Sequence, residues 1–161
     1  MAKKYRKVAV GGTFDLLHKG HLYLIRKALE VGDSVIIGLT SDEMLRAYPK
    51  NHPVAPFEER KKILLNLLDN IGVLERVQIV PLNDPYGPTV TDGEIYALVA
   101  SYETFSRGDE INAIRRKKGF KPLNLIVIDT VLAEDGLPIS TTRIRRGEID
   151  EEGHVLSPKS E

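Results

Sequence analysis

The sequence contains no cysteine among its 161 residues. This absence excludes disulfide bonds, catalysis by a thiolate and zinc sites built from cysteine. Lysine and arginine together number 23, as do aspartate and glutamate, so the formal net charge is zero. A neutral chain has no overall field that would favour nucleic acid or a membrane surface as its main partner. Any binding of anions must therefore depend on local groups.

Long hydrophobic runs and targeting signals are also missing. No apolar run approaches the roughly 20 residues that a transmembrane helix requires. The basic N-terminal lead, residues 1–6, continues directly into a short apolar segment without the longer apolar core of a secretory signal. We therefore expect a cytoplasmic protein. The sequence also lacks the heptad repeat of a coiled coil, so it predicts no particular oligomeric state.

Two common nucleotide-binding fingerprints do not occur either. The sequence has neither the G-x-G-x-x-G loop of dinucleotide-binding domains nor the G-x-x-x-x-G-K-[ST] loop of P-loop proteins. Hydride transfer on NAD and P-loop hydrolysis therefore lack their usual support.

What the sequence does contain is an alternation of apolar runs and helical periods. The runs are continuous, as in parallel strands that are covered on both faces. Apolar residues at helical spacing lie between them, most clearly over 57–71, and a further helix is expected over 109–118. We expect a single Rossmann-like α/β domain over residues 1–161, with about five parallel strands, helices on both faces, and the lead and a tail of about 152–161 at its periphery. The expected strands cover residues 7–10, 34–40, 75–82, 95–101 and 123–129.

The segment GGTFDLLHKGH, residues 11–21, is the most informative part of the chain. It follows the first expected strand and places His18 and His21 at the start of a helix. Unpaired backbone N–H groups and a partial positive charge attract an anion there, and imidazoles add directed donors. Gly20 has no Cβ, so a nucleotide or its phosphates could approach the helix start closely. An ordinary strand-turn-helix with polar caps, or a metal site of Asp15, His18 and His21, remain alternatives.

A second anion-binding element is expected in AEDGLPISTTRIRRGEID, residues 133–150. Ser140 is a good helix N-cap, and hydroxyls and arginines follow it. Because the carboxyl ends of parallel strands meet at one edge of a sheet, this element and the histidine pair should face a single ligand. A capped helix with a solvated basic face is one alternative. Another is a nucleic-acid surface formed by Arg143, Arg145, Arg146 and the basic cluster 115–118.

The two elements resemble the signature pair of the nucleotidyltransferase superfamily. His18, Gly20 and His21 match its His-x-Gly-His box, and residues 139–145 match its I-S-[ST]-T-x-x-R box. Both boxes occur in the expected order near opposite ends of the chain.

The middle of the chain resembles archaeal phosphopantetheine adenylyltransferases in particular. The segments that carry this resemblance are VPLNDPYGP (80–88), SYETFSRGDEIN (101–112) and IDTVLAEDGLPISTTRIRRGEID (128–150). The similarity covers about residues 5–153. The chain departs from the bacterial branch, which commonly has Asp-Pro where this sequence has Asp15 and Leu16, so individual bacterial substrate contacts do not transfer.

The resemblance implies transfer of an adenylyl group from ATP to 4′-phosphopantetheine, which gives 3′-dephospho-coenzyme A and diphosphate in coenzyme A biosynthesis. It implies Mg²⁺ as the companion of ATP, although the sequence offers no dedicated carboxylate cage. The nearest alternatives are CTP:glycerol-3-phosphate cytidylyltransferase and FMN adenylyltransferase. A non-catalytic nucleotide- or coenzyme A-binding module is an alternative from another class, and a metal-binding protein is a more distant one.

The resemblance also implies roles for individual residues. His18 and His21 would contact the ATP phosphates, the hydroxyls of Ser140 to Thr142 would bind the β- and γ-phosphates, and Arg143 or Arg145 would assist the departure of diphosphate. The expected catalytic residues are His18, His21, Lys50 and Arg143. The expected ATP contacts are Gly11, Gly12, Thr13, Phe14, His18, Gly20, His21, Ser140, Thr141, Thr142, Arg143 and Arg145. The expected acceptor contacts are Thr13, Asp15, Lys50, Arg107 and Arg115.

Two of these assignments have plain structural alternatives. Lys50, expected to bridge the acceptor phosphate and the α-phosphate, could equally be a solvated loop residue. Arg115 could serve only to cap the end of its helix.

Overall fold

Five parallel strands form the centre of the fold, in a computed structural model that describes residues 3–101 and 105–156. The strand order is β3-β2-β1-β4-β5, so the sheet grows from β1 first to one side and then to the other. The strands are β1 (Tyr5–Gly12), β2 (Gly32–Thr40), β3 (Val77–Leu82), β4 (Ala97–Ser101) and β5 (Asn124–Ile128). The expected Rossmann-like parallel sheet is confirmed.

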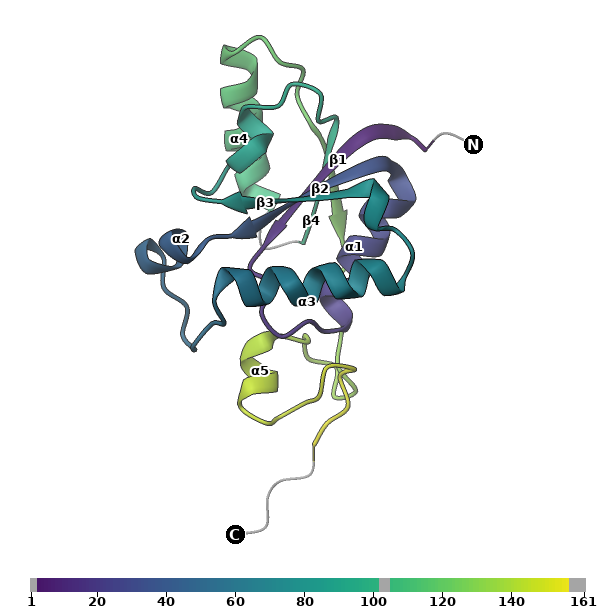
Figure 1. The fold of residues 1–161 in the computed structure, drawn as a ribbon, viewed down its shortest axis with the longest axis vertical. Helices are drawn as coiled ribbons and strands as arrows, with labels where there is room; N and C mark the ends of the chain where they lie inside the picture. The colour runs from purple at the N-terminus through teal and green to yellow at the C-terminus, as the bar shows by residue number, and fades with distance from the viewer. Residues whose placement is uncertain (1–2, 102–104, 157–161) are drawn as a thin grey trace.

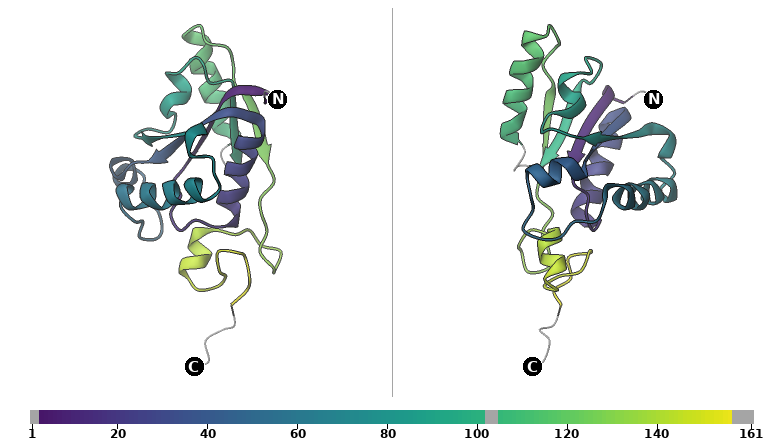
Figure 2. Two further views of the ribbon diagram at one scale, coloured as in Figure 1. Left: turned by 45° about the vertical axis from the view of Figure 1, so that its right-hand side comes forward. Right: turned by 60° about the vertical axis from the view of Figure 1, so that its left-hand side comes forward.

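Helices cover both faces of this sheet, as Figure 1 and Figure 2 show. The helices α1 (Lys19–Val31) and α3 (Phe57–Asn70) pack on one face, and α4 (Phe105–Lys117) packs on the other. The shorter elements are the helices α2 (Asp42–Ala47) and α5 (Thr141–Arg145) and the 3₁₀ turns η1 (Leu74–Arg76) and η2 (Gly87–Val90). Over the described ranges, no helix combines the length and hydropathy needed to cross a bilayer.

The continuous apolar runs of the sequence are explained by a core on each side of the sheet. In β1, Val8 and Val10 point to the face covered by α1 and α3, whereas Ala9 points to the face covered by α4. All three are buried. In β2, Ile37 points to the face covered by α1 and α3, and Ile36 points to the face covered by α4. Because both faces are covered, consecutive positions in the middle of these strands favour apolar residues.

One helix begins earlier than its sequence predicts. The expected start at Asp109 follows Gly108, a poor residue for a helix interior. The structure starts α4 at Phe105 and places Gly108 inside the helix. A Cβ at this position would lie 2.5 Å from Cδ1 of Leu125 in β5, so glycine permits a close approach between helix and sheet. The glycine is therefore a packing feature and not a helix boundary.

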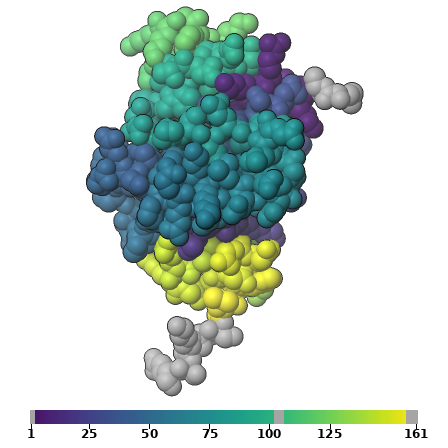
Figure 3. Space-filling model, viewed as in Figure 1, coloured from purple at the N-terminus to yellow at the C-terminus, as the bar shows by residue number. Residues whose placement is uncertain are grey.

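The expected peripheral segments are partly built into the fold. The strand β1 already begins at Tyr5, which pairs with Gly32. Near the other end, the carbonyl of Gly153 accepts a 2.8 Å hydrogen bond from the backbone N–H of Glu134. Residues 131–156 form a C-terminal lobe with its own small apolar cluster, made by Ala133, Ile139 and Ile149. Figure 3 shows the later part of this lobe as a bulge at one end of the molecule.

The strand order positions the functional edge of the sheet. β1 and β4 are adjacent and parallel, so their carboxyl ends lie at one edge of the sheet, and the next strands in sequence, β2 and β5, lie on opposite sides of this pair. Such a switch in strand order opens a crevice in parallel sheets. The C-terminal lobe follows β5 and lies at this same edge.

Candidate active site

Two histidines cap the first helix reciprocally at the edge of the sheet. His18 is the N-cap of α1, with extended backbone. Its Nδ1 accepts hydrogen bonds from the backbone N–H groups of Gly20 at 3.0 Å and His21 at 3.4 Å. In return, Nδ1 of His21 accepts from the backbone N–H of His18 at 3.2 Å. The pair forms a capping box in which imidazoles replace the usual hydroxyl and carboxylate.

The capping geometry fixes the protonation of both rings. Because each Nδ1 accepts a hydrogen bond, each neutral ring carries its proton on Nε2. Burial lowers the pKa of His18 to about 4. Burial, with a further contribution from His18, lowers the pKa of His21 to about 3. At neutral pH the site therefore presents two stacked, uncharged imidazoles, with ring centroids 3.8 Å apart, as Nε2–H donors.

Gly20 leaves space for the ring of His18. The space that a Cβ would occupy is filled by the imidazole of His18, with Cε1 at 2.8 Å and Nδ1 at 3.0 Å. The glycine thus permits the histidine to fold back over the helix start. Gly20 also borders the cavity described below, and the expected close approach of a nucleotide stays a prediction.

The turn between β1 and α1 is held in an unusual conformation. Phe14 has φ 50° and Leu16 has φ 46°, in the left-handed region that side chains with a Cβ rarely adopt. The ring of Phe14 is buried and lies 5.1 Å from that of His21, at 45° between the ring planes. The ring of Phe14 therefore packs against the imidazole of His21. Backbone strain of this kind persists only where the surrounding structure enforces it.

A cavity of about 440 Å³ joins the two sequence elements, and we call it the histidine cavity. His18 and His21 border it on the β1 side, and Ser140, Thr141 and Thr142 border it on the side of the C-terminal lobe. The histidine pair and the hydroxyl cluster therefore border the same cavity, and their binding of one ligand stays a prediction. The other expected site residues around it are Gly11, Gly12, Thr13, Phe14, Asp15, Gly20 and Lys50.

The three hydroxyls of the second element are not equivalent. The Oγ of Ser140 accepts from the backbone N–H of Arg143 at 3.2 Å, so its own proton remains available. Thr141 donates its hydroxyl proton to the carbonyl of Asp15 at 2.7 Å. Among the described residues, the hydroxyl protons of Ser140 and Thr142 therefore remain free to be donated, whereas Thr141 connects α5 to the first motif.

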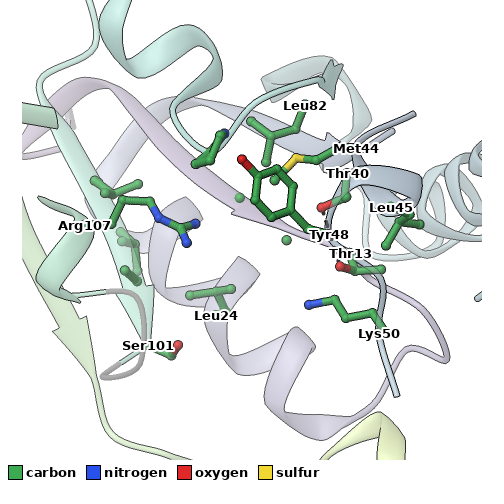
Figure 4. Close-up of a pocket in the computed structure, with 16 residues that line it drawn as sticks. Thr13, Leu24, Thr40, Met44, Leu45, Tyr48, Lys50, Leu82, Ser101 and Arg107 are labelled. Atoms are coloured by element: carbon green, nitrogen blue, oxygen red, sulfur yellow. Dashed lines mark hydrogen bonds between the residues drawn. The ribbon is translucent and has the colours of Figure 1, made fainter. Parts of the chain in front are cut away.

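A second cavity of about 310 Å³ adjoins the first, and we call it the Tyr48 cavity. Its walls are mainly apolar, with contributions from Leu24, Leu45 and Leu82. Figure 4 shows the ammonium of Lys50 and the guanidinium of Arg107 pointing into it from opposite sides. The residues that border both cavities are Gly11, Gly12, Thr13, Leu24, Lys50 and Ser101. The junction of the two cavities thus carries the hydroxyls of Thr13 and Ser101 and the ammonium group of Lys50.

Neither arginine of the second element reaches the cavities. Arg143 donates to Asp135, to Glu148 and to the carbonyl of Pro138. Arg145 forms a bidentate ion pair with Asp15, with N–O distances of 2.9 and 3.1 Å. The expected phosphate contacts of both arginines, and the expected acceptor contact of Asp15, are thus replaced by ion pairs in this structure.

The expectation that Arg115 binds the acceptor is wrong. Its side chain is 1% exposed, and its guanidinium donates to the backbone carbonyls of Thr89, Asp92, Ile95 and Lys121 at 2.7 to 3.1 Å. These bonds close the 89–95 loop against the end of α4. A guanidinium with its donors committed in this way is part of the fold and not of a ligand site.

Arg60 was missed by the sequence analysis. It is 1% exposed and donates to the carbonyls of Thr13 at 3.0 Å, Thr40 at 2.7 Å and Ala55 at 2.7 Å. It thereby holds together the ends of β1 and β2 and the loop that carries Lys50. A signal was present, because Arg60 lies on the same helical stripe as Leu64 and Leu68 of α3. Other border residues that were missed are His52, Ile128, Asp129, Thr130 and Val131.

Comparisons with known proteins identify relatives of this chain in sequence and in structure. A family model described as cytidylyltransferase-like matches residues 9–147, a range that contains both motifs. A phosphopantetheine adenylyltransferase of Methanothermobacter thermautotrophicus is 50% identical over 156 residues, which are 97% of this chain and 93% of that protein. One of Methanopyrus kandleri is 50% identical over 148 residues, covering 92% and 93%. A solved structure of a protein of unknown function from Archaeoglobus fulgidus is 33% identical, with a TM-score of 0.69 over 83% of this chain and 99% of that one.

Proposed function

Because the chain belongs to the cytidylyltransferase-like family, we propose that it transfers the adenylyl group of ATP to 4′-phosphopantetheine. The products are 3′-dephospho-coenzyme A and diphosphate, in coenzyme A biosynthesis. The relatives from Methanothermobacter and Methanopyrus bear the name of this activity and match nearly the whole chain. The proposal places the enzyme in the cytoplasm, in keeping with its lack of cysteine.

One observation carries the proposal. The histidine cavity, with its imidazole and hydroxyl donors, opens into the mainly apolar Tyr48 cavity at Thr13 and Lys50. A nucleoside triphosphate fits the first environment, and a phosphorylated acceptor with a long, partly apolar arm fits the second. The two phosphate groups that react would then meet at the junction. Holding two reactants in line in this way is a major source of rate enhancement.

The chemistry requires no general base. The second ionisation of a phosphate monoester lies near pH 6, so the acceptor is largely a dianion at neutral pH. One of its oxygens forms a bond to the α-phosphorus of ATP. The bond from that phosphorus to the oxygen bridging to the β-phosphate breaks, and diphosphate leaves with the electron pair. The uncharged histidines suit this reaction, because it needs donors and not proton acceptors.

Each group at the site then has a defined task. The Nε2–H groups of His18 and His21 donate to α-phosphate oxygens, where negative charge grows during attack. Ser140 and Thr142 donate to the β- and γ-phosphates. Lys50 lies at the junction and reduces the repulsion between the two anions. The described residues offer no cluster of three or more acidic, histidine or cysteine side chains for a metal, so Mg²⁺ would enter bound to the triphosphate.

The Tyr48 cavity favours phosphopantetheine over glycerol phosphate as the acceptor. Leucine, methionine and valine side chains border it alongside Arg107. Glycerol phosphate is small and polar and would leave this apolar surface uncovered. The arm of phosphopantetheine carries methyl and methylene groups that can cover it.

The proposal is tested by measuring diphosphate release and product mass with three substrate pairs. These are ATP with 4′-phosphopantetheine, CTP with glycerol 3-phosphate, and ATP with FMN. We expect multiple turnovers with the first pair alone. Turnover only with another pair would assign a different substrate, and binding of ATP without turnover would favour the non-catalytic alternative.

Lys50→Ala tests the junction separately. We expect a lower kcat by tenfold or more, because the variant removes charge where two anions approach. Unchanged kinetics would return Lys50 to the role of a solvated loop residue.

A further inference from the structure

The side chain of Asp15 forms hydrogen bonds with two segments that are distant from it in the sequence. This side chain is 3% exposed. One oxygen accepts from Nε and Nη2 of Arg145 at 3.1 and 2.9 Å, and the other accepts from Nη2 at 3.1 Å and from the backbone N–H of Ala55 at 3.3 Å. The ring of His52 lies 3.8 Å away. A single buried carboxylate thus joins the β1 turn, the C-terminal lobe and the loop that carries Lys50.

The C-terminal lobe depends on such polar connections for its position. Its apolar cluster of Ala133, Ile139 and Ile149 is separate from the two clusters that hold the sheet and its helices together. The described backbone contributes one contact, from the N–H of Lys19 to the carbonyl of Glu151 at 2.9 Å. Thr141 adds its hydroxyl bond to the carbonyl of Asp15. Apolar packing alone therefore does not set the distance between the lobe and α1.

Arg145 is suited to set that distance. A guanidinium presents its donors in a rigid planar fork, and a bidentate pair with a carboxylate fixes orientation as well as separation. Arg145 lies at the end of α5, whose first residues carry the hydroxyls of the histidine cavity. It does not itself border that cavity.

We propose that Asp15 and Arg145 are positioning residues that fix the span between the imidazole pair and the hydroxyls of Ser140 and Thr142. Arg145 then acts on the reaction through Asp15 and not by touching phosphate. This inference rests on the proposed function, since it assumes one triphosphate bound across both elements. The hydrogen bond from the backbone N–H of Ala55 to Asp15 also fixes the position of the loop that carries Lys50.

The test uses the full chain with Arg145→Ala, Asp15→Asn and the double variant. Arg146→Ala is the matched control, because Arg146 is the next residue, its side chain is 68% exposed and its contact with Glu148 is 4.0 Å long. We measure kcat, KM for ATP, KM for phosphopantetheine and the thermal midpoint. A misplacement of about 1 Å can cost about a hundredfold in rate. We expect each single variant to lose tenfold or more in kcat, and the double variant to be no worse than the more severe single variant.

Chemical rescue separates positioning from a contribution to folding alone. Millimolar guanidinium should restore part of the kcat of Arg145→Ala, because it can occupy the space beside Asp15. It should not restore the double variant, which lacks the carboxylate, and methylammonium should act poorly because it lacks the planar fork. A loss of thermal stability with kcat and both KM values unchanged would overturn the proposal.

Two other results are decisive. If Arg145→Ala changes only KM for ATP while Asp15→Asn resembles the unaltered protein, Arg145 touches phosphate directly and the proposal is wrong. If the unaltered chain transfers no adenylyl group with any substrate pair, the proposed function fails on its own. The affinity for ATP then tests the role of Asp15 and Arg145. If the double variant loses less ATP affinity than the sum of the two single variants, the proposed span is supported; if the losses add, the proposal is refuted.

Discussion

The reciprocal capping of His18 and His21 predicts that two substitutions of His18 rank in one order for stability and in the opposite order for activity. In His18, Nδ1 caps the helix, and Nε2 is the donor to phosphate in the proposed reaction. An asparagine places a polar atom near the position of Nδ1, and a glutamine places its amide near the position of Nε2. His18→Asn should therefore keep the cap and lose the donor. His18→Gln should keep a donor and lose the cap.

The magnitudes follow from the two kinds of hydrogen bond. Loss of one preorganised donor to a developing charge costs about 10²- to 10³-fold in kcat. Loss of a helix N-cap costs about 1 kcal/mol, whereas asparagine is among the best capping residues. In a domain of this size, 1 kcal/mol lowers Tm by about 2–4 °C. We expect His18→Asn to be nearly as stable as the unaltered protein but slower by a hundredfold or more. His18→Gln should lose a few degrees of Tm and retain more activity than His18→Asn.

The assay combines diphosphate release at saturating substrates with thermal unfolding of each variant. His154→Asn and His154→Gln are the controls, because His154 is 65% exposed and borders neither cavity. If His18→Asn turned over at a normal rate, the donor role would be refuted. If His18→Gln were the more stable of the two variants, the capping role would be refuted.

Three further changes probe the same structure. Folding lowers the pKa of both imidazoles from 6.5 to about 4 and about 3, so the unfolded chain binds more protons as the pH falls below 6.5. The free energy of unfolding should therefore decrease between pH 7 and pH 4, as measured by urea denaturation, and the decrease should be smaller in His18→Asn; equal slopes would contradict the shifted pKa values. Arg115→Met leaves four backbone carbonyls without their donor and should lower the unfolding free energy by about 3–5 kcal/mol with KM for the acceptor unchanged. A raised acceptor KM with unchanged stability would instead restore the ligand role of Arg115. Gly20→Ala places a Cβ 2.8 Å from the ring of His18 and should reduce kcat about tenfold or more at nearly constant KM for ATP, while normal turnover would show that the ring moves aside without consequence.

The parts of the fold that the sequence predicts are those set by local periodicity. The apolar runs of β1 and β2 are continuous because both faces of the sheet are covered, and this pattern is visible without any tertiary information. The start of α1 after His18 is equally local, since capping involves residues within three positions. The convergence of the two motifs follows from a general property of parallel sheets.

The fate of the arginines could not be predicted in the same way. Arg115 occurs in a basic cluster that is otherwise exposed, and Arg60 is followed by two lysines. Arginine is rarely fully buried, so the sequence predicts an exposed, charged side chain at both positions. Which carbonyls require a donor depends on where loops such as 89–95 lie after folding. That information is absent from local sequence, although the stripe shared by Arg60, Leu64 and Leu68 gives a partial signal.

The pairing of Arg145 with Asp15 was missed for a related reason. The two residues are 130 positions apart, and each has other plausible partners nearby in sequence. A motif assigns an arginine to phosphate because the residue type suits that ligand, but the residue type suits a buried carboxylate equally well. Only the fold decides between them. The structure therefore bears on which side chains of the second motif can reach a ligand: the hydroxyls of Ser140 and Thr142 border the histidine cavity, whereas Arg143 and Arg145 are engaged in ion pairs.

This distribution of charge bears on product release. Around the histidine cavity, the two capping histidines are uncharged at neutral pH, and the hydroxyl donors are uncharged as well. Lys50 stands at the junction with the Tyr48 cavity, and Arg107 lies on the acceptor side. In the proposed reaction, diphosphate would therefore depart from neutral donors, which hold it less tightly than fixed cations would. Lys50 lies at the junction where the two reacting phosphates would meet, so its charge favours the transition state more than it retains the product.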